Sequence, residues 1–216
     1  MGELIILAER LADRSRPGRS ERPAFCFDLA CPFSYLAAER VERILGDVEW
    51  IPTASTLLDG QDWAQQPSMR REAERRAAEL RLPLVWPDGS PARVVGALRA
   101  ACYAAEIGAG ARFALAASRL AFCGGFDLGD PEIVAEAAAA AAMPLDDALV
   151  AFGDCTRDGA LHGTARGLVL RGVRRVPAIR IGRRWFSGEH VVREAAALIR
   201  ARAAAQRPLA PLAPAS

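Results

Sequence analysis

The pattern of apolar and polar positions begins with a strand–helix–strand unit. Apolar runs at residues 24–29 and 48–52 flank residues 32–45, where apolar side chains recur every three or four positions. The runs are typical of buried strands, and the recurrence is typical of a helix with one apolar face. When a helix joins two strands and only a short segment separates the helix from the second strand, the two strands are expected to be parallel.

From about Leu57 to Leu170, apolar residues recur with the spacing of a helix almost throughout. The expected helices cover residues 68–82, 92–107, 109–122, 132–142, 145–152 and 154–170. Their apolar stripes need other helices or the sheet to pack against. A helical stretch of about a hundred residues is longer than an ordinary loop, so it is expected to be an insertion.

The chain returns to β structure near its end. Two short β runs at residues 178–181 and 184–187 are joined by Gly182 and Arg183, as in a hairpin. A last helix is expected from Glu189 to about Ala205. A βαβ half and a ββα half therefore enclose the helical stretch.

Composition fits a chain with a sizeable core, since 51% of its 216 residues are hydrophobic and 25% are charged. A net charge of +2 is too balanced to indicate a nucleic-acid partner, and the basic residues are all arginine, which indicates codon bias. The apolar run near the N-terminus, residues 4–8, is too short for a secretory signal, and no run is long enough to span a membrane. We therefore expect a cytoplasmic protein without a membrane partner.

The cysteines are expected to be unpaired, because a reducing compartment disfavours structural disulfides. Their spacing does not suit a metal ion, and the two histidines are isolated, so no metal site is expected. Four of them are interpreted as structural, although one could act as a resolving thiol: Cys26, Cys102, Cys123 and Cys155.

The fifth cysteine, Cys31, stands where the first apolar run ends and the first helix opens. Pro32 suits the first helical turn, which places Cys31 at the N-cap, facing free backbone N–H groups and the positive end of the helix dipole. This placement predicts a pKa below the usual value and a nucleophilic thiolate. A buried, inert cysteine is an equally common outcome of such a context. Ser34 stands where a dithiol site would have its second cysteine, and its hydroxyl would either support the Cys31 thiolate or bond its own helix backbone.

A second element lies far downstream, at Val176-Pro177. A proline that opens a strand is compatible with a cis peptide in a tight turn. We expect Val176 to face Cys31, and the loop that carries Arg174 and Arg175 to approach it. These arginines would lower the Cys31 pKa or bind an anionic substrate, and a passive surface role is equally consistent with them.

At this point the chain resembles the DsbA-type thioredoxin superfamily, in the branch of 2-hydroxychromene-2-carboxylate isomerases and kappa-class glutathione transferases. The matching segments are residues 27–37, 78–84, 97–100, 172–177 and 181–188. The resemblance implies an α/β thioredoxin-like fold with a large all-helical insertion domain. It divides the chain into an N-terminal extension (1–22), a thioredoxin-like domain (23–56 and 171–205), a helical insertion (57–170) and a disordered tail (206–216).

The chain also departs from that family. The isomerase and kappa branch has serine where Cys31 stands, and the dithiol oxidoreductases have cysteine where Ser34 stands. Glutathione-using members carry an Asp-Arg pair after the last strand, whereas this chain has Glu189 and His190. That difference argues against glutathione in particular.

Three functions remain open. The first is a thiol oxidoreductase that exchanges mixed disulfides through Cys31, with a small thiol or disulfide as substrate. The second is an isomerase or transferase that uses glutathione or another low-molecular-weight thiol as cofactor and an aromatic keto acid as substrate. The third is a binding protein with an inert Cys31. A homodimer is compatible with each. The expected catalytic residues are Cys31 and Ser34, and the expected substrate contacts are Pro32, Phe33, Arg174, Arg175, Val176, Pro177, Glu189 and His190.

Overall fold

The computed structural model of the protein describes residues 22–58, 67–87 and 93–205. The expected N-terminal extension, apart from Arg22, and the expected C-terminal tail lie outside the described residues. Within this part of the chain, no helix is both long and apolar enough to cross a membrane.

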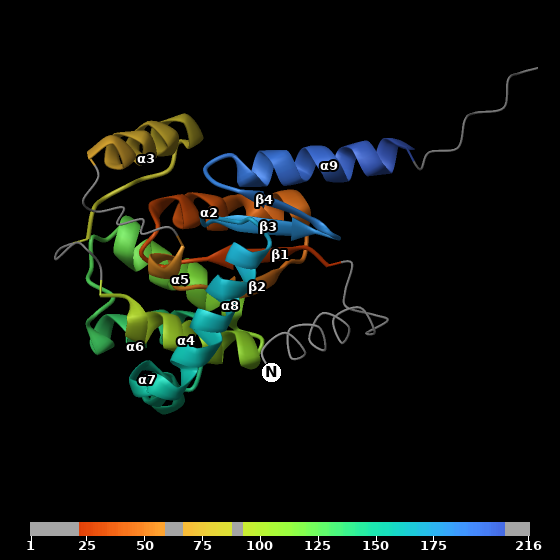
Figure 1. The fold of residues 1–216 in the computed structure, drawn as a ribbon. Coiled ribbons are helices and arrows are strands. Elements are labelled where there is room, and N and C mark those ends of the chain that lie inside the picture. Colours follow the sequence, from red (N-terminus) through yellow and green to blue (C-terminus); the bar gives the residue numbers. More distant parts are fainter. Residues whose placement is uncertain (1–21, 59–66, 88–92, 206–216) are drawn as a thin grey trace, which may run out of the picture.

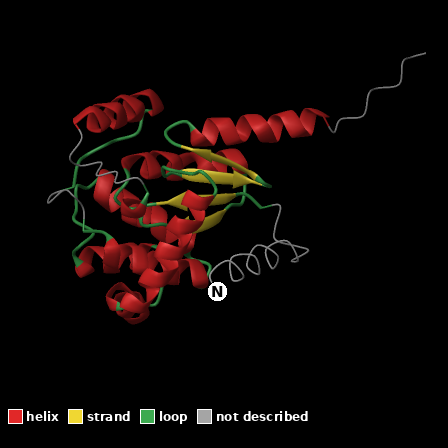
Figure 2. Ribbon diagram, viewed as in Figure 1, coloured by secondary structure: helices red, strands yellow, loops and turns green. Residues whose placement is uncertain are grey.

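Four short strands form one mixed sheet in the order β2-β1-β3-β4 (Figure 2). β1 (Ala24–Phe27) pairs in parallel with β2 (Glu49–Pro52), as the strand–helix–strand pattern predicts. β3 (Ala178–Ile181) pairs antiparallel with β1 and with β4 (Arg184–Ser187). The strand that ends just before Cys31 is therefore a central strand, bordered by the strand that begins just after Pro177.

The helix α2 (Pro32–Leu45) begins and ends where the sequence predicts. Cys31 is its N-cap residue, with an extended backbone, and Pro32 occupies the first turn, where its missing N–H costs nothing. Gly46 ends the helix at a positive φ of 78°, a conformation that glycine adopts without strain. The terminal helix α9 (Val191–Ala205) packs against α2 and against β3 and β4. Figure 1 shows both helices on the same side of the sheet.

Between β2 and β3 the described chain is helical. The helices are α3 (Pro67–Leu80), α4 (Val95–Glu106), α5 (Gly110–Phe122), α6 (Pro131–Ala140), α7 (Leu145–Gly153) and α8 (Asp158–Leu170), with short 3-10 turns at Ser55–Leu57 and Cys155–Arg157. α4, α5 and α8 contact β2, whereas α3 contacts α2 (Figure 1). The resulting architecture is a thioredoxin-like α/β fold with a helical insertion, as expected.

One hydrophobic core runs from the sheet into these helices. Phe25, Phe27 and Trp50 stack on the sheet, and the rings of Phe25 and Trp50 meet edge to face with centroids 4.9 Å apart. The helix interfaces are built largely of buried alanines, which let the helix backbones approach closely. The same cluster continues through α4 and α5, so the helices and the sheet share their buried surface.

Polar side chains explain where the observed elements differ from the expected ones. The expected strand at residues 24–29 stops at Phe27, because Asp28 begins a turn in which its carboxylate accepts a bond from the Ala30 N–H. The expected helix at residues 154–170 is two elements, since Asp154 caps a 3-10 turn before α8 begins.

Truncating a buried side chain of α4 should show how much the helical insertion contributes to stability. Leu98 is 1% exposed, so Leu98→Ala is expected to lower the free energy of unfolding by about 2–5 kcal/mol. Val95, in the same helix, is 51% exposed, and Val95→Ala should change it by about 0.5 kcal/mol or less. Urea unfolding followed by circular dichroism measures both. Equal effects of the two substitutions would contradict the assignment of α4 to the core.

Candidate active site

The sulfur of Cys31 lies against the backbone that precedes β3. Its thiol donates a hydrogen bond to the carbonyl oxygen of Val176, with Sγ and O 3.6 Å apart. The peptide bond between Val176 and Pro177 is cis, as the sequence suggested. Both residues, and Cys31 itself, are buried. The fold therefore brings together the two elements that the sequence singled out 145 positions apart.

The first turn of α2 acts on the acidity of Cys31. The Ser34 side chain, the Ser34 backbone and the Phe33 backbone are three donors that each act to lower the Cys31 pKa. The Ser34 oxygen accepts a hydrogen bond of 3.2 Å from the backbone N–H of Asp28. Support of the Cys31 thiolate by Ser34 stays a prediction.

The expected low pKa of Cys31 is nevertheless wrong for this conformation. Burial outweighs the three donors and raises the pKa of Cys31 to about 12. A thiolate that is removed from water loses its hydration, and the side chain of Cys31 is 0% exposed. The N-cap position predicts a lowered pKa for a thiol that is in contact with solvent. The sequence does not show how deeply Cys31 is buried. In the structure as it stands, Cys31 is a neutral thiol.

Asp28 is a residue of the site that sequence reasoning did not single out. Its carboxylate is buried and accepts bonds from the backbone N–H groups of Ala30, at 2.8 Å, and of Ser55, at 2.7 Å. Burial raises its pKa, while the bonds from Ser55 and Ala30 oppose the rise, and its charge contributes to the raised pKa of Cys31. The available signal was a lone acidic residue inside an apolar strand run.

Arg174 and Arg175 are exposed. The main influences on the Cys31 pKa are burial, Ser34, Asp28 and the Phe33 backbone, and an effect of the two arginines on it stays a prediction. The two arginines directly precede Val176, whose carbonyl oxygen accepts the hydrogen bond from Cys31. Pro32 and Phe33 are buried in the first turn of α2.

Glu189 and His190 lie just before α9. His190 Nε2 is 2.7 Å from Glu189 Oε1, and Arg75, on α3, is 3.8 Å from Glu189 Oε2. Burial, followed by the neighbouring carboxyl of Glu72, raises the pKa of Glu189, whereas Arg75, followed by Glu189, lowers the pKa of Glu72 to about 2. These contacts place Glu189 beside α3.

The remaining cysteines differ in their exposure. All five cysteines are free, and burial raises the pKa of Cys26, on β1, to about 12. Cys102 and Cys123 are half-buried, and Cys155 is exposed. Within the described ranges, no group of three or more acidic, cysteine or histidine side chains could hold a metal ion.

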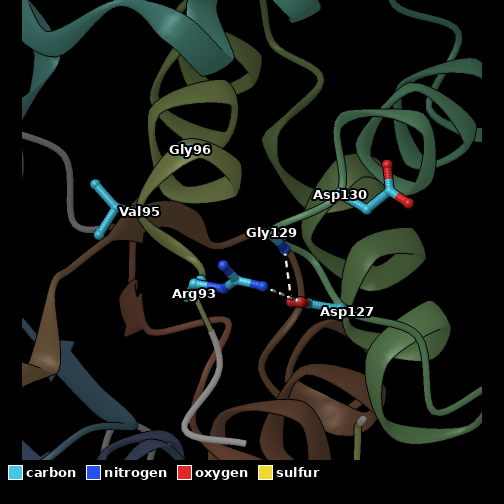
Figure 3. Close-up of a pocket in the computed structure, with 6 residues that line it drawn as sticks. All are labelled: Arg93, Val95, Gly96, Asp127, Gly129 and Asp130. Atoms are coloured by element: carbon cyan, nitrogen blue, oxygen red, sulfur yellow. Dashed lines mark hydrogen bonds and ion pairs between the residues drawn. The ribbon is translucent and has the colours of Figure 1, made fainter. Parts of the chain in front are cut away.

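A pocket of about 520 Å³ lies within the helical insertion, between the N-terminal ends of α4 and α6 (Figure 3). Arg93 reaches Asp127 across it, and Asp127 accepts a bond from the Gly129 N–H (Figure 3). None of the expected site residues lines this pocket. It is therefore separate from the site around Cys31.

Comparison with known proteins agrees with the fold. Residues 24–199 match the DsbA-like thioredoxin domain, so the chain belongs to that family. No curated protein matches the sequence.

Solved structures share the fold at low sequence identity. A 2-hydroxychromene-2-carboxylate isomerase superposes with a TM-score of 0.69 at 16% identity, covering 85% of this chain and 97% of the isomerase. A probable DsbA oxidoreductase from Streptomyces coelicolor gives 0.64 at 20% identity, covering 89% and 93%. The cytosolic disulfide reductase DsbM from Pseudomonas aeruginosa, solved with GSH, gives 0.59 at 16% identity, covering 85% and 99%.

The raised pKa of Cys31 predicts that this thiol resists alkylation at neutral pH. At pH 8 iodoacetamide should modify the exposed Cys155 first, and Cys31 at least about tenfold more slowly, because only the thiolate reacts and Cys31 is both protonated and buried. Peptide mass spectrometry over a time course measures both rates. In concentrated urea the two rates should converge. A Cys31 that reacts as fast as Cys155 in the folded protein would contradict the buried, neutral thiol.

Proposed function

We propose that the protein is a thiol oxidoreductase of the DsbA-like family that works through the single nucleophile Cys31. The observation that carries the proposal is the position of Cys31 at the N-cap of α2, with its sulfur 3.6 Å from the carbonyl oxygen of Val176. The free backbone N–H groups at the start of a helix favour a thiolate and make it a better leaving group.

The reaction has two exchange steps. The Cys31 thiolate attacks one sulfur of a substrate disulfide, forms a mixed disulfide and releases the other sulfur as a thiolate, which takes up a proton. A second thiolate, from a small molecule or a partner, then attacks the substrate sulfur of the mixed disulfide. It forms a new disulfide and returns Cys31 as the thiolate. Ser34 cannot supply the second thiol, so the proposal takes it from another molecule.

The raised pKa determines when this chemistry begins. Burial is the largest cause of the raised pKa of Cys31. A sulfur that comes into contact with solvent or substrate is no longer held protonated by burial, while the donors on α2 still lower its pKa. The Val176 carbonyl, which now accepts the thiol proton, would then bond a backbone N–H of an extended substrate. Pro32, Phe33 and Pro177 would line the contact, and the exposed Arg174 and Arg175 would face an anionic substrate.

A second candidate is a thiol-dependent isomerase or transferase, and the complete burial of Cys31 favours it. A neutral thiol donates a hydrogen bond, so Cys31 and Ser34 would hold the thiolate of a bound cofactor rather than act as the nucleophile. The cofactor would be glutathione or another small thiol, and the substrate an aromatic keto acid. Similarity to an isomerase and to a reductase solved with GSH is compatible with this role. Glu189 and His190 would contact the cofactor, at the cost of their present contacts with each other and of Glu189 with Arg75.

Ser34→Cys tests the first proposal. A cysteine at this position would provide an internal resolving thiol at high effective concentration, so insulin-reduction activity should rise by at least about tenfold. Cys155→Ser serves as the control, since it removes an exposed cysteine without touching the site. Insulin reduction that stays at background in both the parent protein and Ser34→Cys would exclude disulfide exchange through Cys31.

Cys31→Ser separates the two candidates. In an oxidoreductase it should reduce disulfide exchange to the rate without enzyme, because serine cannot form a mixed disulfide. In a thiol-dependent isomerase, turnover of an aromatic keto acid with added glutathione should survive within about tenfold, since a hydroxyl donates the same hydrogen bond. Keto-acid turnover that survives the substitution, in a protein without disulfide exchange, would replace the first proposal by the second.

A further inference from the structure

The Cys31 sulfur is enclosed between α2 and the loop that leads into β3. Cys31 is the N-cap residue of α2, and its thiol donates to the carbonyl oxygen of Val176, just before β3. The residue is 0% exposed. A substrate can therefore reach the sulfur only after an element of the structure moves away from it.

One side of this enclosure is joined to α3. The backbone N–H of Gly188, the residue that follows β4, donates to the carbonyl oxygen of Pro177 at 2.9 Å. Glu189 comes next, and its Oε2 lies 3.8 Å from a terminal nitrogen of Arg75 on α3. Figure 1 shows α3 at the edge of the molecule, next to the loop that enters α9. Arg75 therefore connects α3 to the residues that hold the proline beside Cys31.

The other side of the enclosure is joined to the C-terminal end of α3. Tyr35 follows Cys31 by one turn of α2, and its hydroxyl donates a bond of 2.9 Å to the carbonyl oxygen of Pro83. Pro83 lies just after α3, and the N–H of Leu82 donates to the carbonyl oxygen of Ala77 within the helix at 3.0 Å. α3 and its last turn therefore bridge the two elements that enclose the sulfur.

The packing of α3 is weaker than that of the helices in the core. Its buried residues are Ala73, Arg76 and Ala77, so it buries no large apolar side chain. α5, in contrast, buries Phe113 and Phe122. Segments that bury few apolar groups open at the lowest free energy, while the rest of a protein stays folded. We therefore expect α3 to open before the core does.

The contact between Arg75 and Glu189 is itself easily broken. The Arg75 side chain is 49% exposed and also pairs with Glu72 and Glu79 of its own helix. The Oε2 atom of Glu189 is buried and has no hydrogen-bond partner among the described residues. An ion pair with one exposed partner and no hydrogen bond contributes little to stability, so it can hold α3 in place without fixing it permanently.

We propose that α3 is a lid over Cys31 and that the pair of Arg75 and Glu189 is its latch. With the latch closed, α3 bridges both sides of the enclosure and the sulfur stays buried. When the latch breaks, α3 moves away from the loop before α9, while the bond between Tyr35 and Pro83 keeps its C-terminal end on α2. The inference rests on the proposed function only in that the lid would admit a disulfide substrate, because exposure of the sulfur can be measured without turnover.

Alkylation of Cys31 by iodoacetamide at pH 8 measures the opening, because a buried thiol reacts only while it is exposed. Arg75→Gln and Glu189→Gln should each raise the rate at Cys31 by about two- to fivefold, the effect of losing a weak ion pair. Arg71→Gln and Glu194→Gln are the matched controls. They remove the same charges from exposed positions of α3 and of the first turn of α9, and they should leave the rate unchanged.

A double variant and a second buried cysteine make the test specific to the lid. Arg75→Gln combined with Glu189→Gln should react no faster than the faster single variant, because both substitutions remove the same contact. Cys26 is buried on β1, so its alkylation rate should stay at that of the parent protein when only α3 opens.

Four results would overturn the lid. They are an unchanged rate at Cys31 in both single variants, an equal rise at Cys26, an equal rise in a control variant, and a double variant that multiplies the two single effects. Faster alkylation in the latch variants of a protein without disulfide exchange would support the lid and contradict only the function proposed for Cys31.

Discussion

The geometry of the site depends on the buried carboxylate of Asp28. It accepts bonds from the backbone N–H groups of Ala30 and Ser55, and its own N–H donates to Ser34. These bonds join the end of β1, the first turn of α2 and the segment that follows β2. A buried carboxylate is tolerated only when such donors surround it, so the three segments are held in one arrangement. Cys31 lies inside that arrangement, and its position follows from it.

At Cys31 two opposing effects meet. The start of a helix offers donors that favour a thiolate, and the buried interior disfavours any unpaired charge. The interior prevails in this conformation, which leaves a neutral thiol that donates to the Val176 carbonyl. The same groups would stabilise the thiolate once the sulfur met water or a substrate. The acidity of this cysteine is therefore coupled to its exposure.

The helical insertion meets the rest of the chain in two chemically different ways. α4 and α5 join the core through alanine-rich, apolar contacts. α3 lies on α2 with the buried residues Ala73, Arg76 and Ala77. Its Arg75 lies 3.8 Å from Glu189, just before α9. The contacts of α3 therefore combine apolar and charged groups.

The sequence by itself determined the elements, because local periodicity, capping and turn residues decide where helices and strands begin and end. It predicted α2, β3 and β4 with their observed ends, the parallel pairing of β1 and β2, and the approach of Val176 to Cys31. Only the tertiary structure decided the charge states and the polar contacts. Burial of Cys31, the bonds of Asp28, and the pairing of Glu189 with α3 arise from residues distant in sequence. Desolvation and electrostatic interaction depend on what surrounds a group in space, and a linear pattern does not contain that information.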